Sequence, residues 1–73
     1  MTYGERAVGL SFNPSGNADV IKLKTLFAAV IDCCHDLREA AASPEVKRMY
    51  SVAITEAQAG QMWSVKAATW RDE

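Results

Sequence analysis

The chain contains few of the residues that mark specialised classes of protein. Its two cysteines, Cys33 and Cys34, are neighbours. Neighbouring side chains on a helix point about 100° apart, so these two cannot form an ordinary structural disulfide with each other. A reduced cytosolic setting fits this cysteine usage best. No run of about 20 apolar residues is present, and Met1 is followed by a polar stretch without the apolar core of a signal peptide. We therefore predict a soluble protein without a membrane anchor.

An excess of either charge is also missing. Eight basic and nine acidic residues give a net charge of −1, so the chain lacks the broad basic surface that a nucleic-acid backbone requires. We expect no DNA or RNA partner, although one or two lysines can still hold a small anionic ligand. The 73 residues allow one domain, 1–73, and a core of this size buries only roughly 60 % of the unfolded chain's surface. Stability from this core alone is marginal, so we expect an additional stabilising contact to support or complete the fold.

Catalytic and metal-binding patterns are absent from the sequence. Cys33, Cys34 and His35 are consecutive, and three consecutive helical residues cannot converge on one ion. There is no Ser/His/Asp set, no paired-carboxylate pattern and no P-loop. We therefore expect that the protein is not an enzyme and that it binds neither a metal ion nor a cofactor.

Two long helices dominate the remaining pattern. Residues 1–16 hold three of the four glycines and one of the two prolines, which predicts an ordered arm with a short helical turn at its start. Asn17 is a good N-cap for a helix over residues 18–42. The apolar residues of that helix alternate at spacings of three and four, which is typical of a packing seam. They are Val20, Leu23, Phe27, Val30, Cys34, Leu37 and Ala41.

The second helix is predicted over residues 44–70. Ser43 is its cap, Pro44 takes the first helical position and Glu45 lies in the first turn. The link of one or two residues predicts an antiparallel hairpin, so the fold class is all-α. A stripe of small residues runs along this helix, and large apolar residues lie on its other sides, which predicts assembly into a compact homo-oligomer. The stripe consists of Ala53, Ala57, Gly60, Ser64 and Ala67.

The start of the first long helix is one candidate ligand site. The Ser15-Gly16 turn precedes free backbone N–H groups that can hold an anion, although an ordinary capped helix is the favoured interpretation. Lys22 and Lys24 point about 200° apart, so only one of them can face a given pocket. Lys24 lies beside the seam, where we expect its charge to meet a partner chain, and Lys22 is expected in solvent.

Aromatic residues supply further candidates. Tyr3 and Phe12 of the arm can stack a nucleobase, a contact worth roughly 1–3 kcal/mol per base, and core packing is the alternative, favoured more for Phe12 than for Tyr3. Lys66 and Arg71 lie near the end of the second helix, where capping is their default role. Trp63 and Trp70 are expected to be buried in an interface.

Four segments of the chain carry a family resemblance. They are Gly9-Leu10-Ser11-Phe12-Asn13-Pro14-Ser15-Gly16, the helix start Val20…Leu23-Lys24, Ser43-Pro44-Glu45-Val46, and Met62-Trp63-Ser64-Val65-Lys66-Ala67. In these segments the chain resembles the hairpin-domain anti-CBASS family, short phage proteins that act as sponges for cyclic oligonucleotide signals. The resemblance covers nearly the whole chain.

This resemblance implies a function and a set of site residues. Members form compact oligomers, typically hexamers, and bind cyclic dinucleotides between protomers, some also binding cyclic trinucleotides at a separate site. They hydrolyse nothing, and they act in the cytoplasm of the infected bacterial host. The implied phosphate-binding lysine matches Lys24, and either Tyr3 or Phe12 is the stacking aromatic. The predicted cyclic-dinucleotide site therefore comprises Tyr3, Phe12, Pro14, Ser15 and Lys24, and Lys66 or Arg71 is the candidate for a trinucleotide site.

A structural or protein-interaction hairpin of phage origin is the alternative function. In that case the seam and the small-residue stripe only assemble the protein or dock a host protein. A pocket-free apolar interface would favour this alternative.

Overall fold

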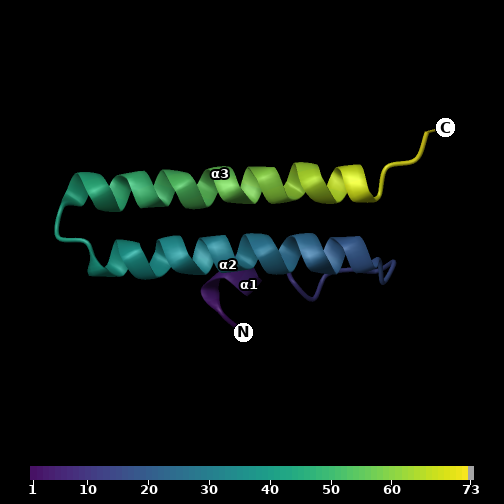
Figure 1. The fold of residues 1–73 in the computed structure, drawn as a ribbon, viewed down its shortest axis with the longest axis horizontal. Helices are drawn as coiled ribbons and strands as arrows, with labels where there is room; N and C mark the ends of the chain where they lie inside the picture. The colour runs from purple at the N-terminus through teal and green to yellow at the C-terminus, as the bar shows by residue number, and fades with distance from the viewer. Residues whose placement is uncertain (73) are drawn as a thin grey trace.

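The computed structural model describes residues 1–72, which form three α-helices and no strand. These are α1 (Tyr3–Ala7), α2 (Ala18–Ala40) and α3 (Pro44–Ala68). The two long helices run antiparallel, and in Figure 1 α1 lies beside α2 and away from α3. The predicted all-α hairpin with an N-terminal arm is confirmed, and the first part of the arm is helical.

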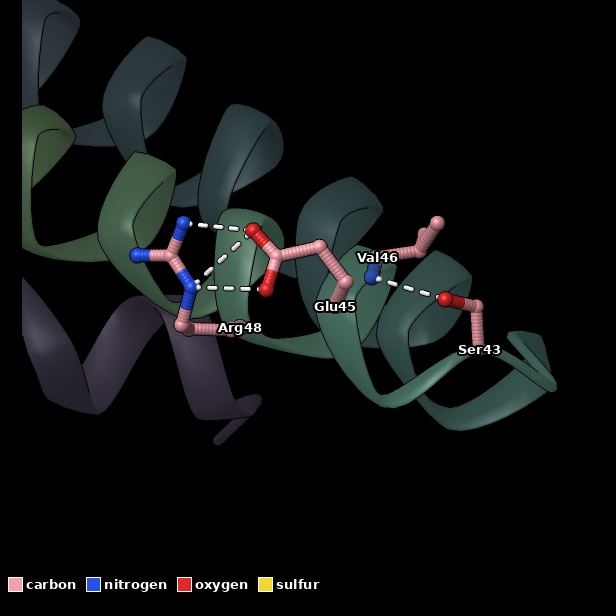
Figure 2. A network of polar contacts seen from close by, with 4 residues as sticks. All are labelled: Ser43, Glu45, Val46 and Arg48. Carbon is pink, nitrogen blue, oxygen red and sulfur yellow. Dashed lines mark hydrogen bonds and ion pairs between the residues drawn. The ribbon is translucent and has the colours of Figure 1, made fainter.

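Both long helices begin where their caps predict. The Asn17 side-chain oxygen accepts hydrogen bonds from the backbone N–H groups of Asp19 and Val20, at 2.8 and 3.2 Å. At the start of α3 the Ser43 hydroxyl accepts from the Val46 N–H at 3.3 Å (Figure 2). Each cap satisfies N–H groups that have no partner inside the helix.

Glu45 and Arg48 form an ion pair one turn into α3 (Figure 2). The hydrogen bond from the Arg48 guanidinium lowers the pKa of the Glu45 carboxyl below its ordinary value of 4.5 and raises the pKa of Arg48. Because the folded-state pKa of Glu45 is the lower one, the pair stabilises the fold above the ordinary glutamate pKa, and this contribution is lost as the pH falls through the folded-state value. Both side chains are exposed, so the pair contributes little to stability.

The two long helices end earlier than predicted. α2 ends at Ala40 and α3 at Ala68, each two residues short of the predicted ends at 42 and 70. Ala41 is extended, with φ −71° and ψ 139°, and residues 41–43 cross from one helix to the other. The residue before a proline is disfavoured in the helical region, so the chain leaves α2 before it reaches Pro44.

The core lies where the arm, α2 and α3 meet. Its buried residues are Val8, Ala28, Ile31 and Ile54, and the Ile31 side chain is 0 % exposed. The predicted seam is correct for Val20, which is buried, and for Phe27 and Cys34, which pack against the core. Val30 and Leu37 are exposed in the single chain, so for these two residues the packing seam stays a prediction. The arm approaches α2 at the small residue Ala28, and this moves the core toward Ala28 and Ile31.

The accessible surface of the chain is larger than that of a typical folded monomer of the same mass. Its accessible area is 5089 Å², whereas a folded monomer of its mass, 8.0 kDa, exposes about 4,450 Å² by the usual scaling of area with mass. Large apolar side chains contribute to this surface on both long helices, among them Leu26, Val30, Met62 and Trp63. A larger apolar surface than a monomer needs is typical of an interaction site.

We predict that Ser43→Ala lowers the free energy of unfolding by about 1 kcal/mol, because it removes the N-cap of α3. Chemical denaturation followed by circular dichroism, at matched protein concentration, measures the change. Ser11→Ala is the control, since Ser11 is exposed and caps no helix. Equal stability of the two variants would contradict the capping role.

Helix α1 is held against α2 by a close backbone approach at Gly4. The Gly4 N–H donates to the Asp32 carboxylate at 2.6 Å. A Cβ at Gly4 would lie 2.1 Å from the backbone oxygen of Ala28, which is far inside van der Waals contact. Only glycine permits this approach.

We predict that Gly4→Ala displaces α1 and destabilises the fold by about 1–3 kcal/mol, the usual cost of overpacking. Amide hydrogen exchange of residues 4–8 should become faster, whereas the amides in the middle of α3 keep their protection. Unchanged exchange in residues 4–8 would show that α1 tolerates the methyl group.

Candidate ligand-binding site

A hollow of about 330 Å³ lies where the arm meets the start of α2 and the end of α3. We call it the arm hollow. Its walls are Phe12, Asn13, Pro14, Ser15, Val20, Lys24, Val65 and Thr69. Four of the five residues predicted for the cyclic-dinucleotide site are therefore brought together here, and the fifth, Tyr3, lies elsewhere.

Lys24 is the charged residue of the arm hollow, and it is buried. The side chain is 5 % exposed. Its Nζ donates to the carbonyl oxygen of Gly9 at 2.9 Å and also to that of Phe12. The Phe12 ring lies over the same nitrogen, with its centroid 5.6 Å away. Within the single chain the arm covers this charge, and the contact with a partner chain stays a prediction.

Within the described part of the chain, no carboxylate forms an ion pair with Lys24. Within residues 1–72, Glu45 and Arg48 form the one side-chain ion pair. An ammonium has three N–H donors, and the two arm carbonyls use two of them. A charge without a counter-ion acts more strongly when it is buried, since water screens it less. The arm hollow therefore favours an anion near Lys24.

The backbone of the arm is shaped to reach Lys24. Gly9 has a φ of +62°, in the left-handed region that glycine adopts without strain. Its carbonyl also accepts from the Phe12 N–H at 2.9 Å, which closes a turn. This turn directs the carbonyl groups of Gly9 and Phe12 to the same ammonium and leaves the Phe12 side chain 73 % exposed.

Asn13 fixes the next part of the arm, and sequence reasoning missed it. Its side-chain oxygen accepts from the Asn17 N–H at 3.3 Å and from the Ser15 hydroxyl at 3.4 Å, and its Nδ2 donates to the Asn17 carbonyl at 3.0 Å. These bonds hold Pro14 and Ser15 at the wall of the arm hollow. The signal was present in the sequence, since an Asn-Pro-Ser-Gly run is typical of a turn closed by the asparagine side chain.

The start of α2 is an ordinary N-cap and not a free anion site, which is the interpretation favoured from the sequence. The Asn17 side chain occupies the N–H groups of Asp19 and Val20, which an anion would otherwise use. The Asn17 Nδ2 also donates to the Ala68 carbonyl at 3.5 Å, so the cap of α2 is joined to the end of α3.

The end of α3 contributes two further wall residues, Val65 and Thr69, that sequence reasoning did not assign to the site. Val65 is half-buried and gives an apolar surface. The Thr69 hydroxyl donates to the Val65 carbonyl at 2.8 Å, so its oxygen keeps lone pairs that can accept a hydrogen bond. Their distance in sequence from the arm hides both residues from motif reasoning.

Tyr3 lies outside the arm hollow, at the first position of the short helix α1. Its ring stacks on His35 with the centroids 4.3 Å apart and an interplanar angle of 6°. The Arg38 guanidinium carbon lies 5.7 Å from the Tyr3 centroid, and Arg38 and His35 are joined by a 3.0 Å hydrogen bond. Tyr3 is 40 % exposed against 73 % for Phe12, so the expectation that Phe12 is the more buried of the two was wrong.

Lys66 and Arg71 lie apart from the arm hollow. The Lys66 ammonium lies 5.3 Å from the Trp63 ring centroid and 5.9 Å from that of Trp70. Both tryptophans are exposed, as is Arg71. Lys66 is therefore held by two aromatic rings in the last turn of α3.

A neighbouring hollow is larger but less suited to an anion. It measures about 550 Å³ and lies between the first turns of α2 and the end of α3. Its walls are Asp19, Lys22, Leu23, Ser64, Ala67 and Ala68. It has no aromatic ring for a base, and the Asp19 carboxylate opposes an anion.

Other classes of site find no support in residues 1–72. No group of three or more His, Cys, Asp or Glu side chains in this range can hold a metal ion. Cys33 and Cys34 are free thiols. None of the helices described is both long enough and apolar enough to span a bilayer.

The fold and the arm hollow define a class: a helical hairpin whose N-terminal arm encloses a cation and presents an aromatic ring. The family model described as Acb2/Tad1, hairpin domain, matches residues 5–69. The chain belongs to this family, the anti-CBASS cyclic-nucleotide sponges, which are binding proteins and not enzymes. Curated proteins and solved structures gave no match.

We predict that Lys24→Met destabilises the fold by about 1–3 kcal/mol, because the carbonyl groups of Gly9 and Phe12 lose a buried donor. Lys22→Met is the matched control, since Lys22 is two residues away and exposed. Thermal and chemical denaturation at one protein concentration compare the two. Equal stability would mean that Lys24 does not anchor the arm.

Proposed function

We propose that this protein binds cyclic dinucleotides in the arm hollow and sequesters them without cleavage, which blocks CBASS signalling in the cytoplasm of an infected bacterial host. Family membership supports the ligand class. The observation that carries the proposal is the buried Lys24 ammonium, which has no carboxylate partner within residues 1–72 and lies beside an exposed Phe12 ring.

The ligand's chemistry matches these two groups. A cyclic dinucleotide carries two phosphodiester charges and two flat bases. The third N–H of Lys24 is available for a phosphate oxygen, and a charge-assisted hydrogen bond of this kind is stronger than a neutral one. The Phe12 ring offers a stacking surface worth roughly 1–3 kcal/mol for a base. Pro14 and Ser15 form the neighbouring wall.

A second copy of the chain is needed to enclose the ligand. The arm hollow has about 330 Å³, close to the lower end of the roughly 300–1,000 Å³ that ligand pockets occupy. Its rim is open, and apolar side chains are exposed on both long helices. We propose a homo-oligomer, a hexamer as the family resemblance implies, in which a neighbouring chain closes the arm hollow.

Sequestration fits the chemistry of the wall. No carboxylate, histidine or thiol lines the arm hollow, so no side chain there can activate water against a phosphodiester. A bound ligand stays intact, and tight binding alone removes it from its receptor. The affinity that this requires, a Kd near 1 nM, corresponds to about −12.3 kcal/mol.

Tyr3 and the trinucleotide site remain predictions. Tyr3 can reach a ligand in the arm hollow only from another copy, because within one chain it stacks on His35. Lys66 and Arg71 stay the candidates for a cyclic trinucleotide.

Phe12→Leu is the direct test of the stacking role. We predict that it weakens cyclic-dinucleotide binding by about fivefold or more, as the loss of roughly 1–3 kcal/mol of stacking requires. The Phe12 side chain is mostly exposed, so the fold should be unaffected. Isothermal titration calorimetry with cyclic dinucleotides of adenosine and guanosine measures the affinity. Tyr3→Leu is the control, and a larger loss in that variant would transfer the stacking role to Tyr3.

A structural or protein-interaction hairpin is the second candidate function, favoured by the exposed apolar side chains of α2 and α3. It predicts an oligomer that binds none of the cyclic nucleotides. In that case both Phe12→Leu and the unmodified chain give no heat of binding.

A further inference from the structure

The face of α3 that points away from α2 carries a second regular apolar pattern. In Figure 1 no other element covers this side of α3. Six residues on this face follow one another at alternating spacings of four and three, which is the repeat of a coiled-coil seam. We call these residues the outer seam: Val52, Glu56, Ala59, Trp63, Lys66 and Trp70.

Within residues 1–72 no other helix covers the large apolar residues of the outer seam, which are exposed. Val52, Trp63 and Trp70 are among the exposed large apolar residues, with Trp63 at 70 % and Trp70 at 61 %. Trp70 follows the last turn of α3, and it lies near Trp63, since the Lys66 ammonium is 5.3 Å from the Trp63 ring centroid and 5.9 Å from that of Trp70. Two exposed tryptophans on one helix face are typical of an interface anchor.

We propose that the outer seam pairs with the outer seam of a second copy of this chain, antiparallel and about a two-fold axis near residue 61. In this register Glu56 of each chain faces Lys66 of the other. The small Ala59 faces the large Trp63, and Val52 faces Trp70. Every position of the outer seam then meets another position of the outer seam, as an isologous interface requires.

The two charges select this register over its neighbours. A parallel pairing puts Glu56 opposite Glu56, which like-charge repulsion disfavours. An antiparallel pairing shifted by one step puts Glu56 opposite Ala59 and Lys66 opposite Met49, so each charge faces an apolar group and neither gains an opposite charge across the interface. Only the register centred near residue 61 pairs both charges and matches a small residue to each Trp63. The inference concerns assembly and holds whether or not the arm hollow binds a nucleotide.

Disulfide trapping tests the contact in the full-length chain. In a background with Cys33→Ser and Cys34→Ala, we introduce Glu56→Cys together with Lys66→Cys. These positions lie about 15 Å apart along one helix, too far for a disulfide within one chain. Mild oxidation should give a covalent dimer on a non-reducing gel.

The control pair is Met49→Cys with Lys66→Cys in the same background, which reports the register shifted by one step. It should give little covalent dimer. No dimer from the 56/66 pair, or as much dimer from the 49/66 pair, would overturn the proposed register.

Charge exchange tests the same pair without cysteines. Glu56→Lys should raise the dissociation constant of the assembly by about tenfold or more, because two like-charge contacts form in each dimer. Adding Lys66→Glu should restore it to near the original value, as sedimentation equilibrium would show. A single variant that assembles normally, or a double variant that stays dissociated, would contradict the proposal. Glu39→Lys on α2 is the control for net charge.

Discussion

The burial of the Lys24 ammonium under the arm is the interaction on which the rest of the structure depends. Lys24 lies on α2, yet it bonds to the carbonyl groups of Gly9 and Phe12, so one side chain fixes the arm to the hairpin. The same bonds place the exposed Phe12 ring beside the charge. If a nonpolar side chain replaced Lys24, the carbonyls would lose their donor and the arm hollow would lose both its charge and its shape.

The small size of the chain explains why ligand binding and assembly are linked in our proposals. The core contains few fully buried apolar residues, and the long helices keep many large apolar side chains on the surface. The arm covers a second face of α2, but α3 packs mainly against α2, so contacts with other copies would add stability to a chain of this size. The arm hollow is open at its rim, and a neighbouring chain can close it. The small core of this short chain therefore favours both an oligomer and a ligand site formed between two of its copies.

Much of the fold was predictable because local chemistry decides it. Asn17 and the Ser43-Pro44 pair mark both helix starts, and the structure confirms them. The site was predictable in part. Lys24, Phe12, Pro14 and Ser15 were identified and do line one hollow, whereas Thr69 and Val65 come from the far end of the chain and carry no motif. The position of Tyr3 outside the arm hollow of its own chain was not predictable, because its stacking on His35 depends on how α1 docks at Gly4, a backbone approach that no periodicity reveals.

Native mass spectrometry with a panel of cyclic di- and trinucleotides tests the central claim most directly, because it counts subunits and bound ligands together. Our account predicts an even-numbered assembly, as the two-fold pairing of α3 requires, that retains intact cyclic dinucleotide with no mass for a cleaved product. An assembly that retains no member of the panel would contradict the claim and leave an interaction hairpin as the function of this fold.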